Sequence, residues 1–172
     1  MSMIRTAAPA AHAPIATCAS ASPAPHIVIV PCGKAKQNTA SQARAMYTGS
    51  YHRAAMRAAQ AMAARAPGTR VAILSAKYGL LTDLDETIEP YDVTAGQAGA
   101  ITSAQLRRQV AALGLAHAEV TVLAGRRYVE LAQSVWPAAR TPLAGVGGMG
   151  LQLQRLCRIA ATGDASRRGE QE

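Results

Sequence analysis

The chain has 172 residues, a length that fits one domain built on a single hydrophobic core. Lys and Arg outnumber Asp and Glu by 18 to 10, giving a net charge of +8 that favours polyanionic partners, although an Ala- and Arg-rich composition alone also accounts for it. The 3 scattered cysteines exclude a disulfide framework and a cysteine zinc site, and the 4 histidines lack ligand spacing, so we expect a cytoplasmic protein with no metal and no cofactor.

Three short apolar runs, at 26–30, 71–74 and 120–123, are predicted to be buried strands. Each is continuous and is followed by small or polar residues, which is typical of parallel strands covered on both faces. The preceding residues, 1–25, are predicted to be an Ala/Pro-rich disordered tail. No apolar run is long enough to cross a membrane, so no membrane partner is expected.

Helices are predicted at 49–66, 103–113, 127–135 and 151–161, with Thr48 or Ser50 capping the first and Ser103 the second. Strands that alternate with helices predict a three-layer α/β domain with a mostly parallel sheet flanked by helices. This domain is expected to occupy 26–161, followed by a second disordered tail at 162–172. The oligomeric state does not follow from the sequence.

The polar segments 31–36, 75–79 and 124–128 directly follow the three strands. In such sheets functional residues gather beyond the carboxyl ends of the strands. In the first segment Gly33 permits a tight turn, and backbone N–H groups near Lys34 and Lys36 form a plausible anion cradle. Cys32 is either a nucleophilic thiol or a small packing residue.

Lysine is rare in this chain: the 3 lysines, against 15 arginines, all lie in these strand-end segments. An amine can lose its proton and act as a base or nucleophile, whereas a guanidinium cannot. Lys36 or Lys77 is therefore expected to be a reactive amine, and simple phosphate contact is the alternative.

The segment 75–92 holds 5 of the 10 acidic residues. Lys77 followed by Glu89 and Asp92 is expected to form an acid–base group, because neighbouring charges separate their pKa values. Tyr78 and Tyr91 are expected to stack on a planar base or to hydrogen-bond a ligand. A solvated acidic loop is the alternative interpretation.

Further ligand contacts are expected at the predicted helix starts, where backbone N–H groups bind anions. His52 is either a general acid–base or a surface residue, and the glycine-rich run before the last helix is either a phosphate seat or a flexible turn. Besides the residues already named, the expected ligand contacts are Tyr47, Ser50, Ser75, Gly125, Arg126, Arg127, Tyr128, Gly147 and Gly148.

The order of these motifs resembles the YaaA-like group, and within it a compact bacterial and phage branch of unknown function. The resemblance rests on Lys34, Tyr47-Thr48-Gly49, Ser75-Ala76-Lys77-Tyr78-Gly79, Glu89-Pro90-Tyr91-Asp92 and Ala124-Gly125-Arg126-Arg127-Tyr128. It implies oxidative-stress protection and DNA binding. A fainter likeness, through Pro31, Cys32 and Lys36, is to the catalytic core of archaeosine synthase, which implies a site for a planar base.

Two functions are therefore expected. The first is an enzyme that modifies or processes a nucleobase, a nucleotide or a base in nucleic acid, of a transferase or glycosidase type. The alternative is a non-catalytic DNA- or RNA-binding stress protein. A sensor domain without turnover would use similar residues.

Overall fold

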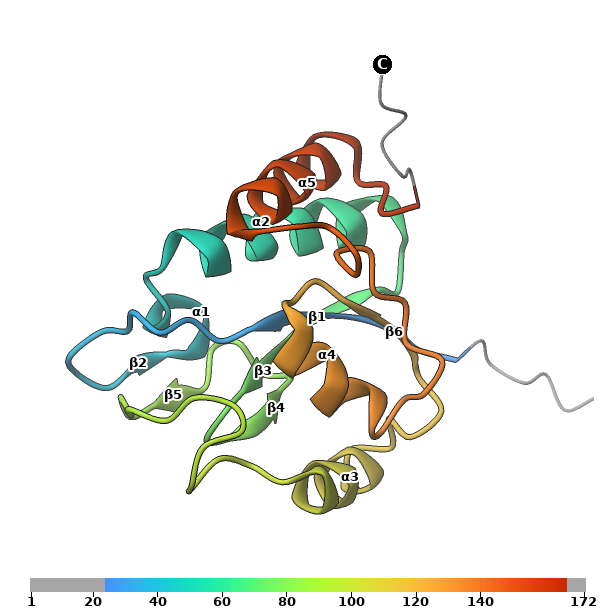
Figure 1. The fold of residues 1–172 in the computed structure, drawn as a ribbon. Coiled ribbons are helices and arrows are strands. Elements are labelled where there is room, and N and C mark those ends of the chain that lie inside the picture. Colours follow the sequence, from blue (N-terminus) through green and yellow to red (C-terminus); the bar gives the residue numbers. More distant parts are fainter. Residues whose placement is uncertain (1–23, 167–172) are drawn as a thin grey trace, which may run out of the picture.

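The computed structural model describes residues 24–166, which form a mixed α/β domain around a four-stranded, mostly parallel sheet (Figure 1). The strand order is β4-β3-β1-β6, and β1 lies parallel to both neighbours. Their bounds are β1 (His26–Pro31), β3 (Arg70–Ser75), β4 (Gly79–Leu81) and β6 (Glu119–Val122). The three predicted strands are thus present, each within a residue of its expected ends.

The antiparallel pairing of β4 with β3 was not predicted. Gly79 has a φ of +78°, a backbone conformation that glycine adopts without steric cost, and the chain reverses there directly after β3. A separate pair, β2 (Ser41–Gln42) and β5 (Thr87–Ile88), is antiparallel as well. Such two-residue strands are too short to produce a recognisable alternation in the sequence.

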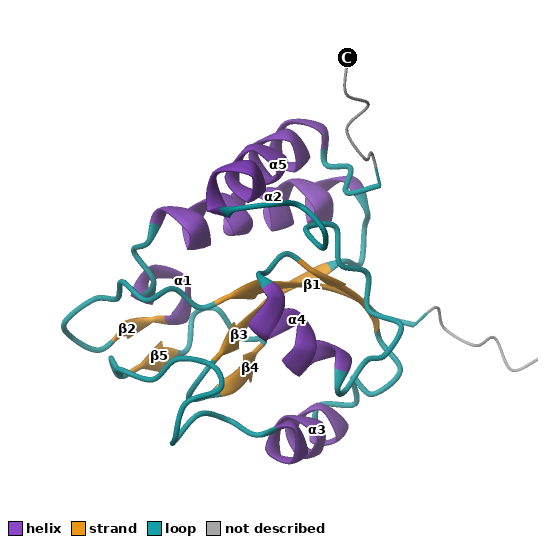
Figure 2. Cartoon of the chain, viewed as in Figure 1, coloured by secondary structure: helices purple, strands orange, loops and turns teal. Residues whose placement is uncertain are grey.

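Helices pack on both faces of the sheet (Figure 2). Val28 and Val30 of β1 belong to the core that contains residues of α2 (Ser50–Arg65) and α5 (Met149–Thr162). Ile27 and Ile29 belong to the other core, with α3 (Ser103–Ala112) and α4 (Arg126–Gln133). This division follows from the alternation of side chains along a strand. A fifth helix, α1 (Ala43–Met46), is a single turn before α2.

The expected helix caps are corrected by the structure. Thr102, not Ser103, caps α3: its side chain accepts from the backbone N–H of Gln105, whose own side chain completes a capping box. Neither Thr48 nor Ser50 caps α2, because Gly49 occupies the N-cap in an extended conformation and Ser50 is already helical. Gly125 and Gly148 likewise precede α4 and α5, and none of these three helices has a side-chain cap.

Helices α2 and α5 lie side by side and point in the same direction. The Tyr51 hydroxyl donates to Oε1 of Gln152 over 2.7 Å near their starts, and Gly163 lies against Arg65 near their ends. Of the predicted tails, 1–23 and 167–172 lie outside the described residues, whereas Thr162 is the last residue of α5. Across 24–166, no helix is both long and apolar enough to cross a membrane.

Candidate functional site

Three elements meet at the carboxyl end of β1. Cys32 directly follows that strand, and its sulfur accepts a hydrogen bond of 3.4 Å from the backbone N–H of Ala76, beyond β3. The Tyr128 hydroxyl, in the first turn of α4, lies 2.9 Å from Cys32 Sγ. The parallel sheet therefore brings the three predicted strand-end segments to one place.

Tyr91 is the hub of a hydroxyl cluster beside this thiol. Its hydroxyl lies 2.8 Å from Ser75 Oγ and 3.0 Å from the hydroxyl of Tyr47. Ser75 and Tyr47 are buried, whereas Tyr91 is partly exposed. A polar network of this kind, reached from solvent through Tyr91, is a plausible place for proton transfer to a ligand.

The direction of these hydrogen bonds follows from the capacity of a hydroxyl group. Ser75 Oγ accepts from the backbone N–H groups of Lys77, at 3.2 Å, and Tyr78, at 3.0 Å. A serine hydroxyl has two lone pairs and one hydrogen, so Ser75 donates that hydrogen to Tyr91. Tyr91 is left with its own hydrogen to donate, and the Tyr47 hydroxyl is within hydrogen-bond distance.

The buried phenols are protonated at neutral pH. Burial raises the pKa of Tyr47 to about 12, against the opposing effect of its hydrogen-bonded neighbours Tyr91 and Ser75. Burial, and after it the neighbouring Cys32, raises the pKa of Tyr91 and of Tyr128. The cluster therefore offers hydroxyl donors rather than phenolate bases.

Two lysines reach the same tyrosine from different loops. The ammonium of Lys36 lies 4.3 Å from the centre of the Tyr91 ring, and that of Lys77 lies 5.9 Å from it and 5.1 Å from the Tyr78 ring. These are cation–π distances. Lys36 also donates to the backbone carbonyl of Lys34 over 3.4 Å, while the Lys34 side chain is exposed.

The expected pairing of lysine with carboxylate is not formed. Glu89 and Asp92 are exposed, and within residues 24–166 the ion pairs all involve arginine rather than lysine. The hydroxyl of Tyr78 donates to the backbone carbonyl of Glu89 over 3.1 Å, not to its carboxylate. Within the described residues, the two ammonium groups therefore face aromatic rings and form no ion pair with a carboxylate.

The rings of Tyr78 and Tyr91 are packed edge to face, with their centres 5.5 Å apart and their planes at 85°. Tyr47 approaches Tyr91 in the same way, at 6.5 Å and 78°. With Lys36 over one face as well, the Tyr91 ring is largely engaged within the protein. The Tyr91 hydroxyl is hydrogen-bonded to Ser75 and Tyr47, and the Tyr78 ring, like that of Tyr91, is partly exposed.

His52 lies in the first turn of α2 and is 2% exposed. Its Nδ1 lies 2.8 Å from the carbonyl oxygen of Pro31, so Nδ1 carries the proton and donates, while Nε2 is buried and has no hydrogen-bond partner among the described residues. Burial lowers its pKa, against the opposing effect of the Pro31 hydrogen bond. Gly33 and the Tyr47 ring lie directly against it. His52 is therefore a buried neutral residue beneath the cluster, not a surface histidine.

The other expected contacts do not join this cluster. Ser50 is exposed, and Arg126 is paired with Glu130 at 2.8 Å on the surface of α4. Arg127 lines a shallow surface pocket together with the first residues of α3. Gly125 has no side chain, and open space lies where a Cβ would stand. Gly147, followed by Gly148, lines a separate cavity beside α5. Among residues 24–166, no group of His, Cys, Asp and Glu is arranged to hold a metal ion.

Gln109 of α3 is the supporting residue that sequence reasoning missed. Its Nε2 donates to the carbonyls of Tyr78, at 3.2 Å, and Leu80, at 3.1 Å, and its Oε1 accepts from the backbone N–H of Leu80 at 2.8 Å. These bonds hold the turn that carries Lys77. A glutamine in a polar helix gives no sequence signal for such a role.

Comparison with known proteins identifies a family but no activity. The model of a family of unknown function (DUF6884) matches residues 27–158. No curated protein and no solved structure gives a significant match. The site described above lies entirely within the matched residues.

Proposed function

Because the chain belongs to the DUF6884 family, whose function is unknown, we propose a function from the chemistry of its site: an enzyme acting on a nucleobase, a nucleotide or a base in nucleic acid. The observation that carries this proposal is the convergence of Lys36 and Lys77, from two different loops, on Tyr91. Tyr91 is itself hydrogen-bonded to Ser75 and Tyr47.

The two lysines supply positive charge for a phosphate or another anion. No carboxylate within ion-pair distance neutralises them in the described part of the chain, so an anionic ligand meets no competing acid. One of the two amines, once desolvated by the bound ligand, would serve as the base or nucleophile.

The tyrosines supply the complementary groups. The partly exposed ring of Tyr78 offers a surface on which a planar base stacks, with Lys77 already at its side. The Ser75–Tyr91–Tyr47 hydroxyls donate hydrogen bonds and move a proton without becoming charged. Glu89 and Asp92, exposed on the same segment as Tyr91, would act on a ligand only after it binds.

The resemblance to YaaA-like proteins and to the archaeosine synthase core supports the same assignment. The residues that carry it, Cys32, Lys36, Ser75, Lys77 and Tyr91, lie together at the carboxyl ends of β1 and β3. We therefore also propose that the chain is related to the YaaA-like proteins and that its reaction is of a transferase or glycosidase type.

The test is a thermal-shift screen of the purified protein with nucleobases, nucleotides, deazaguanines and a short DNA duplex. A ligand at ~100 times its dissociation constant stabilises by about 2.7 kcal/mol, which is readily measured. We expect a small-molecule shift that is lost in Lys36→Met and in Lys77→Met. The control is Arg108→Met, which removes the same charge from an exposed position on α3. A ligand shift that survives both lysine substitutions would refute the assignment.

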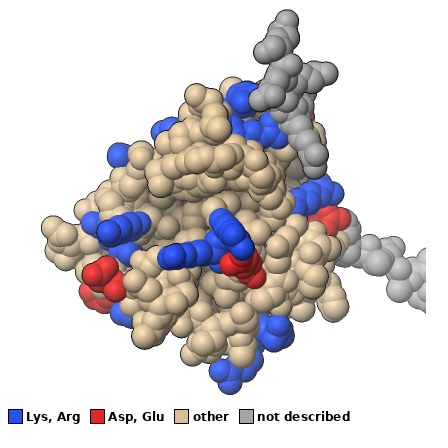
Figure 3. Space-filling model, viewed as in Figure 1, with Lys and Arg blue, Asp and Glu red and all other residues tan. Residues whose placement is uncertain are grey.

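The second candidate is a nucleic-acid-binding protein without turnover. It is favoured by the net charge of +8 and by the basic side chains that dot the face shown in Figure 3. Binding of this kind weakens steeply with salt, with log K falling by roughly 0.9 per log unit of salt for each neutralised phosphate of duplex DNA. A duplex shift that vanishes with salt and is indifferent to Lys36 and Lys77 would favour it.

A further inference from the structure

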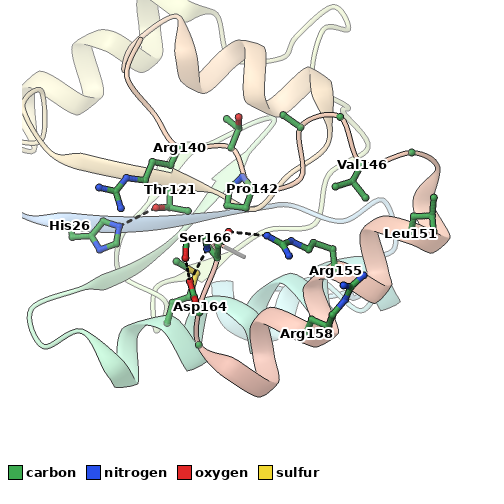
Figure 4. A pocket seen from close by; sticks show the side chains of 17 residues that line it. His26, Thr121, Arg140, Pro142, Val146, Leu151, Arg155, Arg158, Asp164 and Ser166 are labelled. Carbon is green, nitrogen blue, oxygen red and sulfur yellow. Dashed lines mark hydrogen bonds between the residues drawn. The ribbon is translucent and has the colours of Figure 1, made fainter. Parts of the chain in front are cut away.

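A cavity of about 1290 Å³ lies between α5 and the edge of the sheet at β6 (Figure 4). Its walls come from α5, from the segment 140–147 that follows α4, and from the residues 163–166 that follow α5. Cys32, Ser75, Tyr91 and the lysines of the proposed site do not line it. It is therefore a second site, separate from the hydroxyl cluster.

The walls of this cavity carry an excess of positive charge. Arg140 contributes from the sheet side, and Arg155 and Arg158 contribute from α5, while Asp164 is the one carboxylate among the lining residues (Figure 4). Arg140 lies 3.9 Å from Glu119 in a pair that is largely exposed on both sides and therefore weak.

Arg155 is the decisive residue because it is buried, with 7% of its surface exposed. Its guanidinium donates to the carbonyl of Ala165 over 3.1 Å. A guanidinium has five N–H donors, and this bond uses one of them. A buried cation is costly unless it is paired and hydrogen-bonded, so an anion bound in the cavity that Arg155 lines would stabilise it.

His26 contributes no charge to the cavity wall. Its two ring nitrogens lie 3.1 Å from the hydroxyls of Thr69 and Thr121, and burial lowers its pKa, against the opposing effect of Glu119. The positive charge of the cavity wall is thus that of its arginines.

We propose that this cavity binds a phosphoryl group through Arg155 and Arg158. Guanidinium groups pair with phosphate oxygens in a bidentate manner, and two of them three residues apart on α5 suit a group with several anionic oxygens. The cavity exceeds the 300–1,000 Å³ or so of common ligand pockets, so a nucleotide-sized molecule fits. The phosphoryl group belongs either to such a molecule or to a nucleic-acid backbone.

The test is titration of the full-length protein with pyrophosphate, ATP and a short DNA duplex at fixed ionic strength, followed by calorimetry. We expect pyrophosphate to bind, and to bind about tenfold or more weakly in Arg158→Gln and in Arg155→Lys. Arg158 is exposed, so its substitution leaves folding intact even if the buried Arg155 does not tolerate change. ATP binding that exceeds duplex binding identifies a free nucleotide as the source, and the reverse identifies nucleic acid.

Two control variants decide the outcome. Arg108→Gln removes an equal charge from α3 and is expected to bind as the wild type does; equal loss there would show diffuse attraction and overturn the proposal. Lys77→Met reports on the proposed catalytic site: pyrophosphate binding that is lost in Lys77→Met but kept in Arg158→Gln would place the anion at the hydroxyl cluster and overturn the cavity proposal.

Discussion

The hydroxyl of Tyr128 lies 2.9 Å from the sulfur of Cys32, joining the first turn of α4 to the end of β1. The two residues are 96 positions apart in the sequence. This contact closes the hydroxyl cluster on the side of β6. Its contribution to stability is directly measurable.

Tyr128→Phe removes this bond and leaves the ring. We expect the free energy of unfolding to fall by about 1 kcal/mol, the usual net value of an intramolecular hydrogen bond. Tyr78→Phe is the matched control, because its hydroxyl donates to the Glu89 carbonyl at an exposed position where water replaces it. Urea unfolding monitored by circular dichroism measures both; equal losses in the two variants would show that the Tyr128 hydroxyl does not contribute through Cys32.

Acid is expected to destabilise the fold through His52. Burial lowers its pKa in the folded protein, so below about pH 6.5 the imidazole binds a proton in the unfolded chain but not yet in the folded chain. Stability is therefore full above that pH and is lost as the pH falls toward the folded pKa. We expect the drop in unfolding free energy between pH 7.5 and pH 5 to be smaller in His52→Asn, whose amide retains a donor toward Pro31. An identical drop in both proteins would exclude His52 as the cause.

Alkali is expected to destabilise the fold through the buried tyrosines. Burial raises the pKa of Tyr47 and of Tyr51 to about 12, from 10.0 in the unfolded chain. The folded state keeps these protons while the unfolded state releases them, so stability declines as the pH rises above about 10. Absorbance of tyrosinate at 295 nm should then rise together with loss of the circular dichroism signal. A smooth titration of every tyrosine near pH 10, with the fold intact, would contradict this.

The sheet was predictable because its three parallel strands are continuous apolar runs of the length that a covered strand requires. The four longer helices were predictable from their length and their Gly and Pro boundaries, whereas the single turn of α1 (Ala43–Met46) was not predicted. Strand β4 was not, because Gly79-Leu80-Leu81 is too short to show a pattern and its pairing depends on the positive φ of Gly79. Caps were misplaced by one residue, since Thr102 and Ser103 are equally good candidates by composition and only the backbone distinguishes them.

The sequence predicted where the candidate site lies in the fold, but not which of its side chains contact one another. Strand-end segments converge in any parallel sheet, so Cys32, Ser75 and Lys77 were expected together. The bonds among Tyr47, Tyr91 and Ser75 depend on where the loop 82–102 runs, and no local pattern specifies that path. The burial of His52 was equally hidden, because a histidine in the first turn of a helix faces solvent or core according to what packs there.

Gln109 connects helix α3 to the β3–β4 turn. Helix α3 packs against the face of the sheet opposite to α2. The Gln109 side chain hydrogen-bonds the backbone of the residues on both sides of Gly79, which lies two residues beyond Lys77. A displacement of α3 would therefore move the backbone of the turn that carries Lys77, a lysine of the proposed site.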